Sequence, residues 1–466
     1  MLYLQIIFLR TGIIWFVSFL LLSLVGCGKG NEEAHMDQKS KREVKPEIKR
    51  FHQVVKAGTL AELQQRLESG IDVNAAGENG MNALMIALEA KDLEKMQLLL
   101  ARGADPELTD DHNATALDYA VSEDFAAGVQ ELLARGVNRG YHPKYPLKKI
   151  DFGEDTFDFI KINMPEELKG EMSEEEWLES FEETKALMAE MGQNPTVEPA
   201  IVGVYSVEVL KLFLDAGDDL SLASPEMKRL LLKLDDQAMF QATPAEYLKY
   251  KSPRFGTANP ERMDNPFWSD MIQIGGNAYQ AREHFQDGTA FENPGVVWCA
   301  DRFGSSLTPV KEGRYVQVGG EHEDYYDPDF YIYNDVVIYD GKGSFQILGY
   351  PKDVFPPTDF HTATLVEDTI YLIGGAGYPE QRKPGFTPVY RLHTDSWKIE
   401  AVKTSGEMPG WISNHRARYE PTKNTIRVEA GKLSILNEDE ELDLVTNQSE
   451  YELDLSTLVW RKLKSD

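Results

Sequence analysis

The chain has 466 residues and an acidic composition, with 48 Lys and Arg against 77 Asp and Glu and a formal net charge of −29. Binding to nucleic acid or to anionic lipid headgroups depends on clustered basic residues, so this balance argues against both kinds of partner. A hydrophobic content of 42%, in a chain long enough for two or three domains, excludes disorder throughout.

The N-terminal segment contains a short apolar run that ends at a cysteine. Arg10 precedes the run, which begins at Ile13 and closes with Leu-Val-Gly immediately before Cys27. The run, 13–26, is shorter than the roughly 20 residues that a membrane-spanning helix needs. Polar residues follow at once, as they do after a cleaved secretory signal, so a signal peptide is predicted over 1–26.

The sequence Leu-Val-Gly-Cys resembles the lipobox of bacterial lipoproteins. The resemblance implies diacylation of the Cys27 sulfur, cleavage before Cys27 and acylation of the new amine, and several acyl chains anchor a protein stably to a membrane. It also implies a bacterial cell-envelope location, at the outer membrane in a Gram-negative host, because Gly28 is not the Asp that retains many lipoproteins in the inner membrane. The polar residues 27–46 are then a disordered tether.

Glycines recur at an equal spacing in the next segment, at Gly70, Gly103 and Gly136, each after a helix-like apolar pattern. A residue just past a helix end often adopts positive φ, which glycine takes at least cost. Two helices and a turn in a period of about 33 residues resemble the ankyrin repeat. The family's Thr-Pro-Leu-His motif appears here as Asn-Ala-Leu-Met at 82–85 and Thr-Ala-Leu-Asp at 115–118, without its Pro and His.

A fourth repeat is predicted to be interrupted. Gly217 ends another helix-like stretch, and the next repeat after Gly136 should end about 33 residues later. Gly217 instead lies more than two periods after Gly136, so an insertion in this repeat is expected at about 140–195. The ankyrin-like repeats then extend over 47–235. A connection rich in Pro, Asn and charge follows over 236–265, and Asn265 with Pro266 predicts the start of a short helix.

A kelch-like domain is predicted over 266–466, and its last 170 or so residues contain a pattern of period two that is typical of strands. An apolar strand ends at Gly319 and Gly320, and a similar strand further along the chain ends at Gly374 and Gly375. Strand, diglycine, strand and aromatic residue at a spacing near 50 resemble the kelch repeat of galactose oxidase-type β-propellers. Three units are clear where propellers have four to eight blades. The predicted fold class is multidomain: an N-terminal ankyrin-like helical solenoid and a C-terminal, all-β, kelch-like propeller or partial propeller.

Few residues are candidates for catalysis or metal binding. Asp359, His361 and His415 lie at matching starts of consecutive units, where they could form an oriented base or instead bond the neighbouring unit. The acidic loop 321–329 offers oxygen ligands for a cation such as calcium, at Asp324, Asp327 and Asp329, but lacks calcium-loop spacing, and we favour a solvated loop. The run 296–300 predicts a buried strand that makes Cys299 a structural residue.

Both repeat types build large surfaces, and the sequence contains no assembled catalytic set. It therefore favours a non-enzymatic protein-binding scaffold or regulator without a cofactor. The alternative is an envelope propeller enzyme or a glycan- or metal-binding module. Ankyrin-like stacks bind through hairpin tips and inner helix faces, so the resemblance implies an unidentified protein partner, basic or polar, at Glu78, Asn79, Met81, Asp110, Asp111 and His112.

Overall fold

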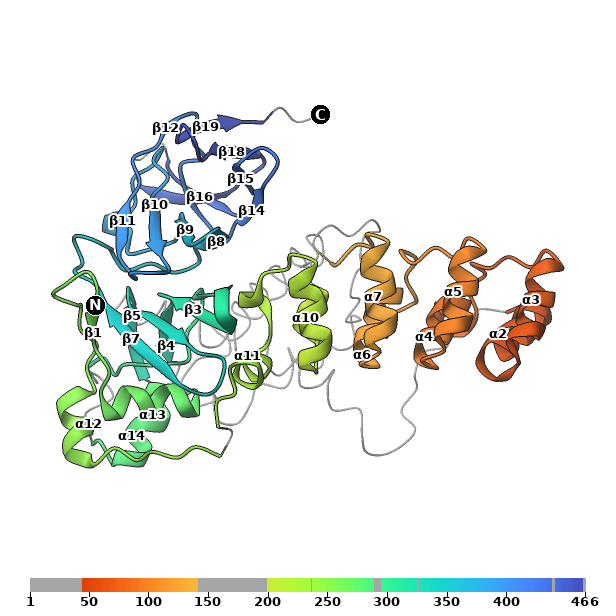
Figure 1. The fold of residues 1–466 in the computed structure, drawn as a ribbon, viewed down its shortest axis with the longest axis horizontal. Coiled ribbons are helices and arrows are strands. Elements are labelled where there is room, and N and C mark those ends of the chain that lie inside the picture. The colour runs from red at the N-terminus through yellow and green to blue at the C-terminus, as the bar shows by residue number, and fades with distance from the viewer. Residues whose placement is uncertain are drawn as a thin grey trace, which may run out of the picture. The chain divides into compact units, whose positions relative to one another are not determined.

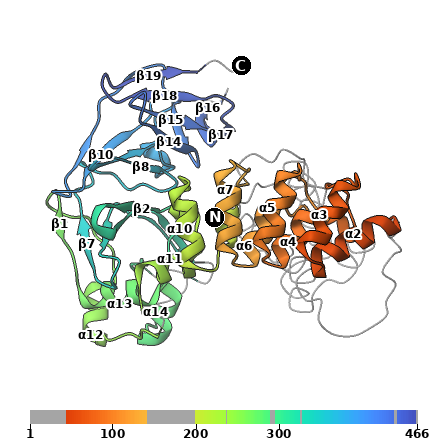
Figure 2. The same cartoon turned by 45° about the vertical axis from the view of Figure 1, so that its right-hand side comes forward.

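The fold was determined as a computed structural model that describes residues 44–140, 199–235, 237–288, 295–324, 327–437 and 441–463 (Figures 1 and 2). The predicted signal peptide, Cys27, most of the tether and most of the predicted insertion lie outside these residues. Within the described ranges, no helix combines the length and apolarity needed to cross a bilayer. The chain divides into two compact units, Met1–Leu212 and Phe213–Asp466.

The first unit is a row of antiparallel helix pairs (Figure 1). The 3-10 turn η2 packs on α6, where the first helix of a further pair would lie, and α10 follows it across the boundary of the unit. The elements are α2 (Pro46–Ala57), α3 (Leu60–Glu68), η1 (Glu78–Gly80), α4 (Ala83–Glu89), α5 (Leu93–Ala101), α6 (Ala116–Ser122), α7 (Ala126–Ala134), η2 (Ala200–Gly203) and α10 (Val207–Asp215).

Capping side chains and glycines define where these helices begin and end. Asn82 accepts a hydrogen bond from the Met85 N–H at the start of α4, and Thr115 does the same from Asp118 at the start of α6. Past α5, Gly103 adopts a φ of 89°, and Ala104 N–H then bonds the Leu99 carbonyl at 3.0 Å. Positive φ also occurs at Gly70, Gly136 and Gly217.

The core of the first unit is centred on the short inner helices. Residues 83–88 of α4 are all buried, because this helix packs against α2, α5 and α6. Lys95 is buried as well, and its ammonium bonds the Val55 carbonyl near the end of α2 at 2.9 Å and pairs with Asp92 at 3.0 Å. A cation at a helix C-terminus satisfies carbonyls that the helix itself leaves open.

The second unit begins with helices that cover one face of a stack of sheets (Figure 2). Asn265 caps α13 by accepting from the Trp268 N–H, as its pairing with Pro266 predicts. Gln273 of α13 donates at 3.1 Å to the carbonyl of Gly343, which lies in the turn between β6 (Val336–Tyr339) and β7 (Phe345–Gly349). These elements are η3 (Leu220–Leu222), α11 (Pro225–Leu232), α12 (Pro244–Tyr250), α13 (Pro266–Ile274) and α14 (Ala278–Phe285).

Three antiparallel sheets follow along the chain, each built on four strands, and they are here called the first, second and third sheets. The first has the order β7-β6-β3-β2, the second β11-β10-β9-β8 and the third β19-β18-β15-β14. The short strands β1 (Glu261–Arg262) and β12 (Ser405–Gly406) add to the outer edges of the first and third sheets.

The strands are β2 (Ser306–Val310), β3 (Arg314–Val318), β6 (Val336–Tyr339), β7 (Phe345–Gly349), β8 (Thr362–Val366), β9 (Thr369–Ile373), β10 (Val389–His393), β11 (Ile399–Ala401), β14 (Arg416–Glu420), β15 (Thr425–Glu429), β18 (Tyr451–Asp454) and β19 (Val459–Lys462).

Two smaller sheets complete the unit. One is the hairpin of β4 (Glu321–Asp324) and β5 (Asp327–Ile332), and the other has the order β13-β16-β17, from β13 (Trp411–Ser413), β16 (Lys432–Leu436) and β17 (Leu442–Thr446). The strand predicted at 296–300 is wrong, because no strand forms there. The N–H groups of Val297 and Cys299 bond the side chains of Asp329 and Tyr333 instead.

The three sheets pack face to face, with their first strands β2, β8 and β14 in contact in turn. Alternate residues of β9 serve two cores: Ile370 and Leu372 pack against the first sheet, and Tyr371 and Ile373 against the third. Within the described residues the strands form five separate sheets, and none of these closes into a ring.

The outer face of the third sheet differs from the faces inside the stack. Ile426 and Val428 of β15 are buried against the second sheet, whereas Arg427 and Glu429 alternate with them and are half-buried on the opposite face. Charges on this face pair along and across strands, as Arg416 does with Glu429 at 3.3 Å. This face has the composition of a solvated end of a stack.

The two diglycines lie where one sheet meets the next. Gly320 N–H bonds the Thr358 carbonyl at 2.9 Å, and Gly375 N–H bonds the Ile412 carbonyl at 2.8 Å. A Cβ on Gly374, whose φ is 69°, would lie 2.2 Å from the Ile412 carbonyl oxygen. A Cβ on Gly319 would lie at the same distance from the Thr358 carbonyl oxygen. Only glycine therefore allows both the turn and the close approach of the neighbouring backbone.

Candidate functional site

The tips of the loops between helix pairs form equivalent hairpins in the first unit. The Gly77 N–H bonds the Met81 carbonyl at 2.8 Å, and one repeat later Asp110 bonds Ala114 at 3.0 Å. The Asp111 N–H then donates to the Asn79 carbonyl at 2.8 Å, which joins one tip to the next. The tips therefore form a continuous edge of backbone.

The predicted partner-binding residues divide into exposed and buried groups. Glu78, Asn79, Asp111 and His112 are exposed on the two tips and Met81 is half-buried beside them, while Glu78 pairs with Lys49 of α2 at 2.8 Å. The exposed side chains lie along the joined edge, where another protein can reach them.

Asp110 has a different role from its neighbours. Its side chain is 3% exposed, and one carboxylate oxygen accepts from the His112 and Ala114 N–H groups at 2.8 Å each. The other oxygen accepts from the Tyr119 hydroxyl at 2.9 Å. Burial and this bond raise the pKa of Tyr119. Asp110 shapes the turn rather than offering its carboxylate to a partner.

Polar bridges between successive loops were not predicted from the sequence. The Asn74 amide donates to the Gly103 carbonyl at 3.2 Å and accepts from the Asp105 N–H at 2.8 Å. One repeat further on, Glu107 accepts from the Asn138 N–H, again at 2.8 Å. Asn74 and Glu107 occupy equivalent positions in successive repeats, so the period itself could have identified them.

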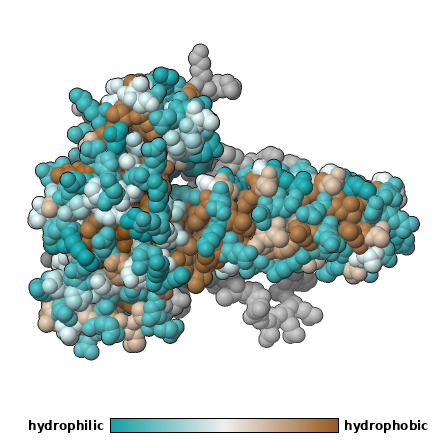
Figure 3. Space-filling model, in the orientation of Figure 1, coloured by the Kyte–Doolittle hydropathy of each residue, from teal (hydrophilic) through white to brown (hydrophobic). Residues whose placement is uncertain are grey.

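The inner helices contribute a mainly acidic face next to the tips. Asp118 is exposed at the start of α6, and Glu89 at the end of α4 lies close enough to Tyr119 to contribute to its raised pKa. Lys56 pairs with Glu89 at 3.9 Å, a weak and exposed contact. Hydrophilic side chains cover much of the visible helical unit, with apolar bands among them (Figure 3).

His361 and His415, the catalytic candidates, are buried and bonded to neighbouring sheets. His361 Nε2 lies 3.0 Å from the Ser306 hydroxyl, and His415 Nε2 lies 2.9 Å from the Thr362 hydroxyl. Burial lowers the pKa of His361 to about 4. Burial, with a smaller effect of His361, lowers that of His415 to about 3. Both imidazoles are therefore neutral at pH 7, and their contacts join sheets.

Asp359 stabilises the turn after the second diglycine. Its carboxylate accepts from the Gly377 N–H at 2.6 Å, and its carbonyl accepts from Ala376 at 2.9 Å. Burial raises the pKa of Asp359, partly offset by hydrogen bonds that include Gly377 and Glu321. Asp359 is 1% exposed, so the structure gives it a structural environment beside His361 rather than an open one.

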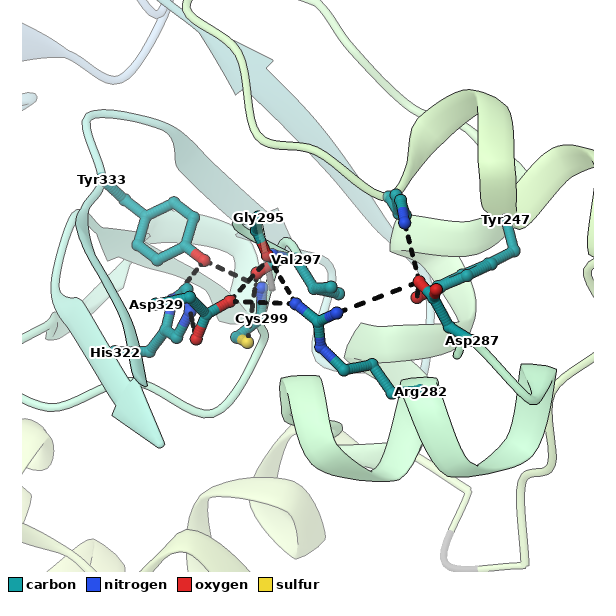
Figure 4. Close-up of polar contacts among 10 residues, drawn as sticks. Tyr247, Arg282, Asp287, Gly295, Val297, Cys299, His322, Asp329 and Tyr333 are labelled. Atoms are coloured by element: carbon teal, nitrogen blue, oxygen red, sulfur yellow. Dashed lines mark hydrogen bonds and ion pairs between the residues drawn. The ribbon is translucent and has the colours of Figure 1, made fainter. Parts of the chain in front are cut away.

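The solvated loop predicted at 321–329 is wrong, because this segment forms most of the β4–β5 hairpin. Asp329 of β5 is buried and belongs to a polar cluster (Figure 4). Its carboxylate accepts from the Val297 N–H at 3.0 Å and lies 3.8 Å from the Arg282 guanidinium. The other oxygen lies 3.2 Å from His322 Nε2, without hydrogen-bond geometry. Side chains at Asp324 and Asp327 lie outside the described part of the structure.

The same cluster continues through His322 and Tyr333. The Tyr333 hydroxyl accepts from the Cys299 N–H at 2.9 Å and lies 2.7 Å from His322 Nδ1. The Tyr333 hydroxyl accepts from Cys299, so its own proton is available for His322 Nδ1. Nδ1 is then the acceptor, and the imidazole proton is on Nε2, which faces Asp329. Burial raises the pKa of Tyr333 well above its ordinary value.

Three ion pairs anchor the cluster to its surroundings. Arg282 reaches the Gly295 carbonyl at 2.5 Å and lies 3.9 Å from Asp287, which also binds Lys251 and the Tyr247 hydroxyl at 2.7 Å (Figure 4). Arg302 pairs with Asp335 and lies over the Tyr333 ring at 3.5 Å. This network connects the β4–β5 hairpin to α14 and the segment around Cys299.

The chemistry of this cluster is that of a buried structural network. Tyr333, His322 and Asp329 are each at most 5% exposed. In the part of the chain that the structure describes, no three His, Cys, Asp or Glu side chains are arranged to hold a metal ion. The candidate functional site is the surface of the loop tips, because exposed polar side chains lie there along a joined edge of backbone.

Comparison with known proteins identifies the repeats. A family model of ankyrin repeats in many copies matches residues 67–120. The chain is similar to the crystal structure of the ankyrin repeat domain of Bcl-3, described as a unique member of the IkappaB protein family, at 27% identity and a TM-score of 0.19.

That likeness covers 19% of this chain and 40% of the Bcl-3 chain, so this chain spans about two fifths of its length. No curated protein matches the chain. The assignment of the repeats rests on the family model. The N-terminal region of this chain contains ankyrin repeats, which form a scaffold for binding other proteins.

Proposed function

We propose that the chain is a lipid-anchored, non-enzymatic protein-binding scaffold or regulator of the bacterial cell envelope. The observation that carries the proposal is the joined edge of loop tips, held by the bond from Asp111 N–H to the Asn79 carbonyl. A rigid row of exposed polar groups suits protein binding because little side-chain and loop ordering is lost on association. Attachment to the membrane is proposed from the Leu-Val-Gly-Cys27 motif.

The chemistry of the surface favours a basic or polar partner. Asp111, Glu89 and Asp118 contribute negative charge, and the chain carries a net charge of −29. Complementary charge raises the rate of encounter and selects among partners. We propose that the partner lies along the tips and the inner helices.

For the second unit we propose a partial kelch-like propeller. Support comes from three successive sheets built on four strands, each beginning at an edge strand that contacts the first strand of the neighbouring sheet, and from the two diglycines at equivalent junctions. In this proposal the sheets are a rigid support that presents the loops and hairpins extending from them.

Charge reversal on the tips tests partner binding. In the native host, the double variant Glu78→Lys/Asp111→Lys should lose those partners that in-cell cross-linking and quantitative mass spectrometry recover with the wild type. The matched control is Glu68→Lys/Glu94→Lys, which makes the same charge change on exposed positions of α3 and α5. Partners lost equally from both variants, or from neither, would contradict a role for the tips.

Metabolic labelling tests the lipid anchor. Wild-type protein should incorporate labelled palmitate and fractionate with membranes, and Cys27→Ser should do neither, because only a thiol at this position accepts the diacylglycerol. Cys299→Ser is the control, since Cys299 is buried. Unlabelled wild-type protein would overturn the proposed location and leave the test of the tips unaffected.

A further inference from the structure

The β16–β17 hairpin exposes leucines along the edge of a sheet. In the order β13-β16-β17, β17 is an edge strand, and β13 pairs only with residues 432–434 of β16. The β16–β17 pairing, which reaches Leu436 and Leu442, therefore extends beyond β13. Figure 2 labels both strands of the hairpin. Its large exposed side chains are Ile435 (37%), Leu436 (53%), Leu442 (38%) and Leu444 (54%).

The three leucines of this set share one face of the hairpin. Leu436 is directly opposite Leu442, and Leu444 is the next residue but one along β17, so all three point the same way. The base of the hairpin is anchored, because Leu433 packs against the core between the second and third sheets. The apolar end is thus held in place by a rigid base.

The backbone of β17 is directed outward at Leu444. Its N–H donates to the side chain of Asp443 at 2.7 Å rather than to β16. Asp443 and Glu441 are exposed, and they place negative charge along the same edge as the leucines. An exposed apolar edge strand is normally blocked because it pairs with other chains, and here an acidic side chain is the only cover of this N–H that the described residues provide.

We propose that β17 binds an extended segment of another protein in which apolar residues alternate with Lys or Arg, added as a strand to the sheet. Its apolar side chains contact Leu442 and Leu444, and its cations contact Glu441 and Asp443. Charge selects this occupant over a second copy of the chain, because pairing two β17 strands brings their carboxylates together. Strand addition of this kind combines backbone bonds for affinity with side chains for specificity.

Fluorescence anisotropy with the full chain tests the proposal. The probe is a labelled, blocked peptide, Lys-Val-Lys-Leu-Lys-Val-Lys, and its control replaces both valines by proline, which keeps the charge but prevents strand pairing. The valine peptide should bind at least tenfold more tightly than the proline peptide. Equal binding would overturn the proposal, because attraction to an acidic chain would then account for it.

Variants of the chain locate the site. Leu442→Ser/Leu444→Ser should weaken binding of the valine peptide at least tenfold, whereas Leu248→Ser, at a 66% exposed leucine of α12, should leave it unchanged. Glu441→Lys/Asp443→Lys should lose this peptide and gain the counterpart with Glu in place of Lys. Unchanged binding by the leucine variant would overturn the site.

Sedimentation velocity tests whether a second copy of the chain, rather than another protein, occupies the β17 edge. The wild type should stay monomeric over a hundredfold range of concentration. A dimer that Leu442→Ser/Leu444→Ser abolishes would assign the edge to a second copy and overturn the proposed partner. The result is independent of the ankyrin surface, which belongs to the first unit.

Discussion

His415 Nε2 lies 2.9 Å from the hydroxyl of Thr362, and this contact joins the start of the third sheet to the start of the second. The same contact occurs one sheet earlier, between His361 and Ser306 at 3.0 Å. Each histidine precedes the first strand of its sheet, and each hydroxyl begins the first strand of the preceding sheet. The repeated positions of the two histidines therefore reflect how the sheets are joined.

These histidines predict acid sensitivity of the second unit. The pKa of His361 is about 4 and that of His415 about 3 in the folded protein, against 6.5 for an ordinary histidine. Between pH 6.5 and these lower values the unfolded chain binds more protons than the folded one. The free energy of unfolding therefore falls as the pH drops below 6.5. We expect a loss of about 2 kcal/mol per histidine between pH 7 and pH 5.

Urea denaturation at the two pH values measures this loss in the wild type and in His361→Gln/His415→Gln. In the variant, the free energy of unfolding should change much less between pH 7 and pH 5 than it does in the wild type, whatever the variant's stability at pH 7. The same difference in both proteins would mean that other groups control the acid sensitivity.

Gly103→Val should destabilise the first unit by about 1–3 kcal/mol. Among the described residues, no atom lies within 4 Å of a Cβ at this position, so the cost comes from placing a β-branched residue at a φ of 89°. Gly288→Val is the control, because a Cβ there likewise meets no described atom within 4 Å and the φ of Gly288 is not positive. Gly77 is unsuitable, since a Cβ there would meet the His52 ring at 2.4 Å. Equal melting temperatures for the two variants would contradict the strain at Gly103.

Asp110→Ala should destabilise the ankyrin repeats much more than His112→Ala. The first change leaves two backbone N–H groups and the Tyr119 hydroxyl without their acceptor, at about 1–3 kcal/mol for each donor that stays buried. His112 is 77% exposed, so its loss should cost within about 0.5 kcal/mol. Thermal denaturation followed by circular dichroism compares the variants, and similar losses would contradict the structural role of Asp110.

Arg302 and Asp335 should act as a unit. Arg302→Met leaves a buried carboxylate without its cation and should cost about 3–5 kcal/mol. In Arg302→Met/Asp335→Asn no charge stays buried, and the new amide oxygen can still accept from Trp298 Nε1, so the double variant should lose less than the two single variants together. Additive losses in chemical denaturation would contradict this coupling.

The ankyrin repeats were predictable because their signals are local. The spacing of Gly70, Gly103 and Gly136 predicted them, and the family model confirms ankyrin repeats in the N-terminal region. The start of α13 at Pro266 follows from its capping residue in the same way. The kelch-like propeller stays a prediction, because sheet closure depends on contacts between distant strands rather than on any single motif.

Other features depend on distant partners and leave no local pattern. The apolar run 296–300 has the composition of a strand, but its N–H groups bond Asp329 and Tyr333, which lie much further along the chain, in β5 and just after it. Asp110 and Asp111 are adjacent acidic residues in one turn, and the composition of the turn does not show that the first is buried with the His112 and Ala114 N–H groups and the Tyr119 hydroxyl as its donors. Sequence periodicity reports which faces are apolar, and it does not report which polar groups meet.

The charged outer face of the third sheet limits how this unit can lengthen in evolution. A tandem copy added after it would press an apolar face against Arg427 and Glu429, whose charges would then lose water without gaining new partners. Duplication of the second sheet meets no such obstacle, because both faces of this sheet are apolar. Ile370 lies on the face that packs against the first sheet, and Tyr371 lies on the face that packs against the third. Longer relatives of this unit should therefore have gained their extra sheets in the interior and kept a charged last one.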